Sequence, residues 1–72
     1  MINFFQDFAH NTGLTFEYEY DDVYDTHRFI FMNPGTQKRW AYMIHTDELK
    51  NQESRNHNGF INFIINNVTK LI

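Results

Sequence analysis

The histidines are the first side chains to test for chemistry. There are four, His10, His27, His45 and His57, and none lies three or four residues from another. A zinc site needs three or four converging ligands, usually drawn from cysteine, histidine and carboxylates. The chain has no cysteine, and a strand pattern described below places His27 and His45 on opposite faces of a sheet. We therefore expect no metal site and no cofactor.

Two tripeptides place a carboxylate beside an imidazole, and a catalytic centre could be built from either. They are Asp25-Thr26-His27 and His45-Thr46-Asp47. Nucleophilic catalysis also needs an activated nucleophile next to the base. The only serine, Ser54, lies in a polar segment, and no glycine-rich turn presents a hydroxyl or cradles a phosphate. We therefore predict that the chain is not an enzyme and has no catalytic residues.

A run of carboxylates is more informative. Five acidic residues fall within nine positions and are interleaved with tyrosines: Glu17, Glu19, Asp21, Asp22 and Asp25. Closely spaced carboxylates can imitate a row of phosphates and occupy a basic groove on another protein. In size, charge and layout the chain resembles small acidic inhibitors carried by phages, some of which block CRISPR nucleases. The alternative is an ordinary solvated hairpin loop.

Basic side chains are few, and the net charge is −3. Affinity for nucleic-acid phosphates needs a basic face. The only clustered cationic and aromatic residues are Arg28, Lys38, Arg39 and Trp40. A nucleic-acid-binding module that uses these four residues is the alternative function, and we do not expect nucleic acid as the partner.

The size of the chain predicts one small domain, residues 1–72. Without cysteine there are no disulfides, so stability must come from a dense core or from a partner chain. The composition favours a dense core, because 18% of the residues are aromatic and each buried aromatic removes a large area from water. No run of 18 apolar residues is present and the N-terminus lacks a signal-peptide pattern, so we expect a cytoplasmic protein without membrane contact.

Hydrophobic periodicity predicts three strands between two helices. Apolar residues alternate with polar ones in residues 14–21, 27–32 and 38–46, which is the period of strands with one buried face. The predicted hairpins pair Tyr20 with His27 and Met32 with Gln37, and this register collects the aromatic side chains on one face. The fold class is therefore α+β: a three-stranded antiparallel meander with helices before and after it (α-β-β-β-α), in two layers.

The helices are predicted from spacing and from end signals. Asn3 is expected to cap the first helix and Gly13 to end it in a left-handed conformation. A stripe at helical spacing in residues 61–72 predicts the last helix, with Asn58 as its cap. Residues 50–58 are almost wholly polar, and we predict a short helical turn followed by a loop there. The core is expected to contain Phe16, Phe29, Trp40 and Ile64.

The face of the sheet opposite the aromatic side chains carries an unexpected apolar group. In the predicted register this group consists of Ile30, Met32, Ala41 and Met43. Contiguous exposed apolar residues mark interaction sites, and methionine adapts readily to partners. Two alternatives stay open: a solvated face joined by cross-strand ion pairs, and a face covered by one of the helices.

Together these patterns predict a small non-enzymatic protein-interaction domain. We hypothesise an inhibitor or adaptor of phage or mobile-element origin that binds a host protein through its sheet face or its acidic hairpin. The predicted protein-binding residues are Glu17, Glu19, Asp21, Asp22, Asp25, Ile30, Met32 and Met43. We also predict a homodimer, formed either through the edge of the third strand or through the apolar group.

Overall fold

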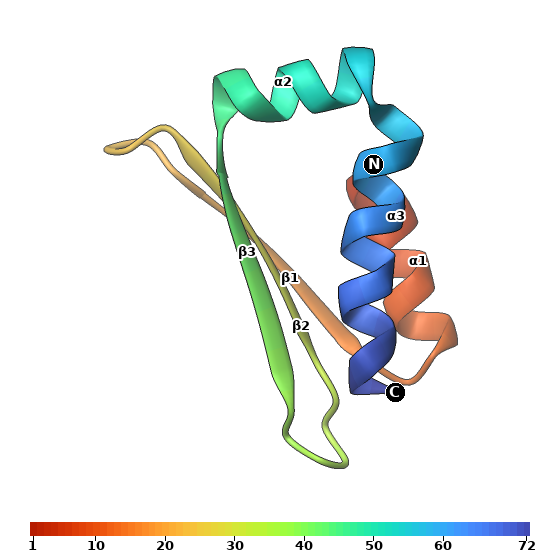
Figure 1. The fold of residues 1–72 in the computed structure, drawn as a ribbon. Coiled ribbons are helices and arrows are strands. Elements are labelled where there is room, and N and C mark those ends of the chain that lie inside the picture. The colour runs from red at the N-terminus through yellow and green to blue at the C-terminus, as the bar shows by residue number, and fades with distance from the viewer.

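A three-stranded antiparallel sheet is the centre of the computed structural model, which describes residues 1–72. The strand order β1-β2-β3 follows the chain, which confirms the predicted meander and the α+β class (Figure 1). In chain order the elements are α1 (Ile2–Asn11), β1 (Thr15–Asp21), β2 (Thr26–Met32), β3 (Arg39–His45), α2 (Thr46–Arg55), α3 (His57–Val68) and the short 3-10 helix η1 (Thr69–Leu71).

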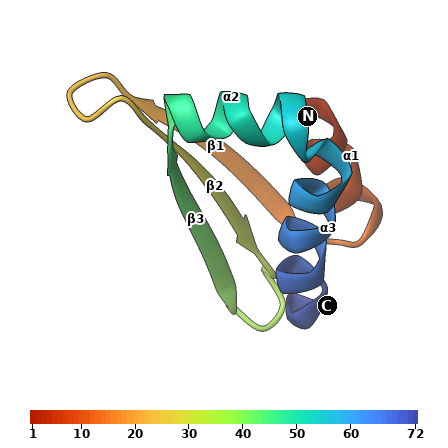
Figure 2. The same cartoon turned by 45° about the horizontal axis from the view of Figure 1, so that its top comes forward.

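All the helices lie on one side of the sheet. Helices α1 and α3 run side by side in both views, while α2 bridges from the end of β3 to the start of α3 (Figures 1 and 2). Between the sheet and these helices lies a core of 11 buried hydrophobic residues: Phe5, Ala9, Leu14, Phe29, Phe31, Ile44, Leu49, Phe60, Ile64, Val68 and Leu71. The opposite face of the sheet has no helix over it.

The first hairpin has the predicted register. Tyr20 pairs with His27, and Phe16 pairs with Phe31. Because side chains alternate along a strand, this register directs the aromatic residues of β1 and β2 toward the helices. Phe29, on the central strand, is almost completely buried.

The second hairpin differs from the prediction by two residues. Met32 pairs with Arg39, not with Gln37. The Asn33 side chain accepts hydrogen bonds from the backbone N–H groups of Gly35 at 2.9 Å and Thr36 at 3.3 Å, and Gln37 adopts a left-handed conformation with φ 63°. These interactions lengthen the loop. A shift of two residues leaves each side chain on its original face, so the predicted faces are correct although the pairing is wrong.

The predicted helix ends are partly wrong. Helix α1 begins at Ile2 after Met1, and no side chain caps it, so Asn3 lies within the first turn. Helix α3 follows Asn56 and contains Asn58, again without a side-chain cap. The end of α1 is as predicted, because Gly13 has φ 77° and reverses the chain into β1.

Helix α2 replaces the predicted loop. Only Leu49 on this helix is buried, which is why the segment shows no hydrophobic stripe. Its stability comes from local interactions that polar residues provide. The Gln52 side chain donates to Glu48 at 2.9 Å. Two acidic residues in the first turn, Asp47 and Glu48, and the basic Arg55 in the last turn complement the helix dipole.

The predicted core is correct in part. Phe29 and Ile64 are buried, whereas Phe16 and Trp40 are only partly buried and pack against the core from its border. The reason is their position: β1 and β3 are the two edges of the sheet, so each side chain has neighbours on one side only.

Candidate functional site: the uncovered face of the sheet

The uncovered face is a surface of twelve side chains from all three strands. The alternation of side chains places on it every second residue of each strand: Thr15, Glu17, Glu19 and Asp21 from β1; Thr26, Arg28, Ile30 and Met32 from β2; Arg39, Ala41, Met43 and His45 from β3. Since the helices all pack on the other face (Figures 1 and 2), the interpretation in which a helix covers this face is wrong.

An apolar patch lies at the centre of this face and toward β3. It consists of Ile30, Met32, Ala41 and Met43. Ile30 pairs directly with Ala41, so the patch crosses from the central strand to the edge strand without a polar break. Met43 is 58% exposed, and Ala41 is also exposed. Burying such residues against a partner would stabilise the complex by roughly 25 cal/mol for each Å² of apolar surface removed from water.

The charges on the uncovered face are arranged around this patch. Arg28 forms an ion pair with Glu19 at 3.3 Å, the cross-strand pair expected from the register. Both side chains are exposed, so the pair adds little to stability. Glu17 and Arg39 form no ion pair. The face therefore presents one free carboxylate on the β1 side and one free guanidinium on the β3 side.

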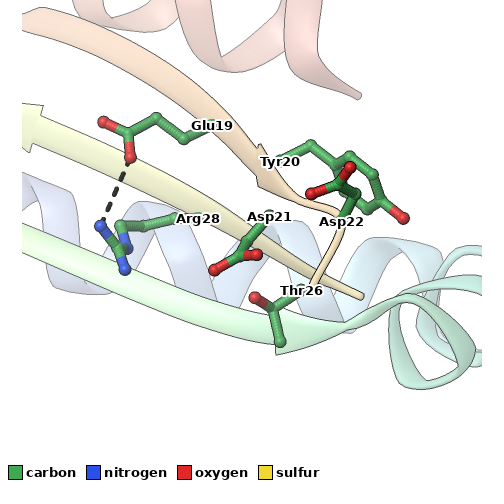
Figure 3. Close-up of a pocket in the computed structure, with 6 residues that line it drawn as sticks. All are labelled: Glu19, Tyr20, Asp21, Asp22, Thr26 and Arg28. Atoms are coloured by element: carbon green, nitrogen blue, oxygen red, sulfur yellow. Dashed lines mark hydrogen bonds and ion pairs between the residues drawn. The ribbon is translucent and has the colours of Figure 1, made fainter. Parts of the chain in front are cut away.

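Arg28 lies where three hollows of the surface meet. The first, drawn in Figure 3, has a volume of about 310 Å³ and is lined by Glu19, Tyr20, Asp21, Asp22, Thr26 and Arg28. The Arg28 guanidinium points toward the Glu19 carboxylate across it. The second, of about 380 Å³, is lined by Asp21, Tyr24, Thr26, Arg28, Met43 and His45. The third, of about 250 Å³, is lined by Thr15, Glu17, Glu19, Arg28, Ile30, Met32 and Arg39.

The lining of these hollows indicates the kind of ligand. Small-molecule pockets are predominantly lined by apolar and aromatic side chains, with a few polar groups. The hollow in Figure 3 is instead lined mostly by carboxylates, a guanidinium and a hydroxyl. The second hollow differs, because Tyr24 and Met43 contribute apolar surface to it.

Two carboxylates of the acidic hairpin already accept hydrogen bonds from other residues of the chain. Asp21 Oδ1 accepts the backbone N–H groups of Val23 at 2.9 Å and Tyr24 at 3.3 Å, which closes the turn. Asp25 has a left-handed backbone, with φ 53°, and its carboxylate accepts two side-chain hydrogen bonds. Asp22 is exposed and makes no side-chain hydrogen bond. A basic partner at this hairpin would therefore find Asp22 free and the other two carboxylates already hydrogen-bonded.

A hydrogen-bonded chain joins the hairpin to the start of α2. Tyr20 donates to Asp25 Oδ1 at 2.7 Å, and the Thr46 hydroxyl donates to the same oxygen at 2.6 Å. His27 Nε2 lies 2.8 Å from the Thr46 hydroxyl, and its Nδ1 contacts the Tyr18 hydroxyl. The bonds from Thr46 and then Tyr20 lower the pKa of Asp25, and the bond to Asp25 raises the pKa of Tyr20.

The sequence did not predict this series of hydrogen bonds, although two signals for it were present. The register already placed Tyr18, Tyr20 and His27 on one face, and residues at the ends of β2 and β3 must meet. A hydroxyl between a carboxylate and an imidazole occurs in nucleophilic sites. In this structure the Thr46 hydroxyl links Asp25 of the hairpin to His27 of β2.

The four residues of the nucleic-acid alternative do not form one surface. Arg28 and Arg39 lie on the uncovered face, and Arg28 is paired with a carboxylate. Lys38 lies in the loop before β3. Trp40 points to the helix side, where it stacks on Tyr42 with ring centroids 5.8 Å apart. Trp40 and the two arginines therefore lie on opposite faces of the sheet.

Comparisons with other proteins add no further assignment: no family model, no curated protein and no solved structure matches the chain. No three side chains of the metal-binding types lie together. None of the helices has the length and apolar character that crossing a membrane requires.

Proposed function

We propose that this chain is a non-enzymatic protein-interaction domain, an inhibitor or adaptor whose uncovered sheet face binds another protein. The observation that carries the proposal is the apolar patch, in which Met43 is 58% exposed on a face without any helix. Exposed apolar patches rimmed by polar residues mark interaction sites in soluble proteins. Ile30 and Met32 extend the patch along the central strand.

The charges around the patch suggest the chemistry of the partner. Glu17 on β1 and Asp22 in the hairpin turn are free to contact basic groups, and Arg39 on β3 is free to contact an acidic group. The partner surface would then have an apolar centre with positive charge on one side and negative charge on the other. Such complementarity raises the association rate and suppresses wrong partners.

The test uses two substitutions that place a charge on an exposed apolar residue. Met43→Asp changes the patch, whereas Val23→Asp changes the hairpin tip, where Val23 is also exposed. Wild-type protein captures a partner from producing or host cells, and calorimetry with the purified partner then measures affinity. We expect Met43→Asp to weaken binding at least about tenfold, or 1.4 kcal/mol, and Val23→Asp to leave it unchanged. The opposite result would move the site to the acidic hairpin.

The nucleic-acid alternative is tested by fluorescence anisotropy with short DNA and RNA at two salt concentrations. Binding through Arg28, Lys38 and Arg39 would weaken steeply with salt, because each phosphate contact releases a counterion. We expect no binding at either concentration. Salt-sensitive binding that Arg39→Ala removes would contradict the proposed function.

A further inference from the structure

The outer edge of β3 has four residues whose backbone groups have no partner strand. The Asn33 N–H donates to Lys38 O at 2.8 Å and the Thr46 N–H to Asp25 O at 3.0 Å. Antiparallel pairs alternate between bonded and non-bonded positions. These two bonds fix the alternation at both ends of β3, so the backbone groups of its even-numbered residues bond to β2. The N–H and C=O groups of its odd-numbered residues point away from the sheet, and these residues are Arg39, Ala41, Met43 and His45.

Between Arg39 and His45, this edge lacks the features that prevent strands from pairing. Natural edges are protected by charges, proline, bulges or a covering helix. Residues 40–44 of β3 carry no charge and no proline, and all seven residues of the strand pair in unbroken register with β2. No helix runs along its outer side (Figure 2). The other edge differs, because β1 carries Glu17, Glu19 and Asp21.

Apolar side chains lie on both faces of the β3 edge. On the helix side Trp40 stacks on Tyr42, and Phe63 packs against them with ring centroids at 6.2 and 5.2 Å. Phe63 is nevertheless 44% exposed. On the uncovered side are Ala41 and Met43. A strand added at this edge would gain backbone hydrogen bonds and would also shield both apolar groups from water.

The distribution of charge favours a second copy of the chain as the source of that strand. The acidic residues lie on β1 and the first hairpin, two strands away from β3. In an edge-to-edge dimer the two β1 strands would be five strand spacings apart, about 24 Å. Charges so far apart are largely screened, since the Debye length is about 8 Å at physiological salt. The repulsion between the acidic residues of the two copies is therefore weak in this arrangement.

We propose that β3 pairs antiparallel with β3 of a second copy, with the two-fold axis at Tyr42. Because Tyr42 is the central residue of β3, this axis pairs all seven residues Arg39–His45 of one copy with the same seven residues of the other. It places Ala41 of one copy opposite Met43 of the other, and both are odd-numbered residues with outward backbone groups. The result is a six-stranded sheet with one continuous uncovered face. The proposal does not depend on a foreign protein partner, so either proposal can fail alone.

Sedimentation equilibrium over a hundredfold concentration range tests the dimer. We expect the mass to rise from 8.8 kDa toward twice that value. Ala41→Pro removes an outward N–H without breaking a bond to β2, and Met43→Lys adds a charge at the edge. Each should raise the dissociation constant at least about tenfold. Ile30→Lys is the matched control on the central strand, and it should leave the dimer intact.

The position of the axis is tested by a single cysteine, because the wild-type chain has none. At the proposed axis the two copies of residue 42 form a non-bonded pair with Cα atoms about 4.5 Å apart, within disulfide range. Tyr42→Cys should therefore cross-link rapidly under mild oxidation, and Tyr24→Cys at the exposed hairpin should not. A mass of 8.8 kDa at all concentrations, equal cross-linking of both variants, or a dimer lost only with Ile30→Lys would overturn the proposal.

Discussion

Replacing Phe29 with alanine tests the packing on which the whole arrangement depends. Phe29 is 1% exposed and its ring lies beside aromatic rings of three elements: Phe5 of α1 at 5.6 Å, Tyr18 and Phe16 of β1 at 5.8 and 6.5 Å, and Phe60 of α3 at 6.4 Å between centroids. Alanine would leave a cavity at the point where the sheet meets both helices. Phenylalanine-to-alanine changes in cores cost about 3–5 kcal/mol.

This loss is large for so small a protein. At roughly 0.05–0.15 kcal/mol per residue, the free energy of unfolding of such a chain is about 4–11 kcal/mol. A loss of 1 kcal/mol lowers the Tm of a domain of this size by about 4–8 °C. We therefore expect Phe29→Ala to lower the Tm by at least about 12 °C. If the free energy of unfolding of the wild type is near the lower end of this range, about 4 kcal/mol, the variant will be largely unfolded at room temperature.

Thermal melting by circular dichroism measures the effect, with Phe4→Ala as the control. Phe4 is the same residue type but is 48% exposed, so its replacement should change the free energy of unfolding by no more than about 1 kcal/mol. Both variants are melted at one protein concentration, because dimerisation makes the Tm depend on concentration. If Phe29→Ala melts within about 5 °C of Phe4→Ala, Phe29 is not central to the core and the register is wrong.

The alternation of polar and apolar residues predicted the faces of the sheet better than its loops. A period of two assigns Phe29 and Ile30 to opposite faces whatever the loop length, and a shift of two residues preserves that assignment. The length of the second loop was not predictable in this way. It depends on Asn33, whose side chain closes the turn and also donates to Leu71 O at 2.7 Å, 38 residues away.

Helix α2 was missed because hydrophobic periodicity is a signal of burial. This helix lies at the border of the molecule and buries only Leu49, so its sequence shows no stripe. The remaining signal was intrinsic propensity, since the segment is rich in glutamate, lysine, glutamine and arginine, which favour helices even when exposed.

The candidate site was predictable in its apolar part and not in its polar part. Ile30, Met32 and Met43 follow from register alone. The engagement of Asp25 depends on a left-handed backbone and on Thr46 arriving from the far end of β3, neither of which leaves a local pattern. Asp25 is exposed, but hydrogen bonds from Tyr20 and Thr46 hold its carboxylate, so it is less free than Asp22 to bind a partner.

Five further substitutions at three positions test the turns that hold these surfaces in place. Gly13→Ala forces a side chain into the left-handed region and should cost about 1–2 kcal/mol in urea denaturation, whereas Gly13→Asn should cost less. Asn33→Ala removes three hydrogen bonds and should cost about 1–3 kcal/mol; Asn33→Asp keeps the acceptor oxygen and should fall between it and wild type. Asp25→Asn keeps the backbone preference but removes the charge. The folded protein holds the pKa of Asp25 below its ordinary value of 3.8, so the ionised carboxylate stabilises the fold above that pH and the contribution is lost as the pH falls through the lowered pKa. Asp25→Asn should therefore melt below wild type at pH 7, and the difference should shrink as the pH falls below 3.8. A difference in Tm that is constant from pH 7 to pH 2 would show that the charge of Asp25 does not act through its bonds to Thr46 and Tyr20.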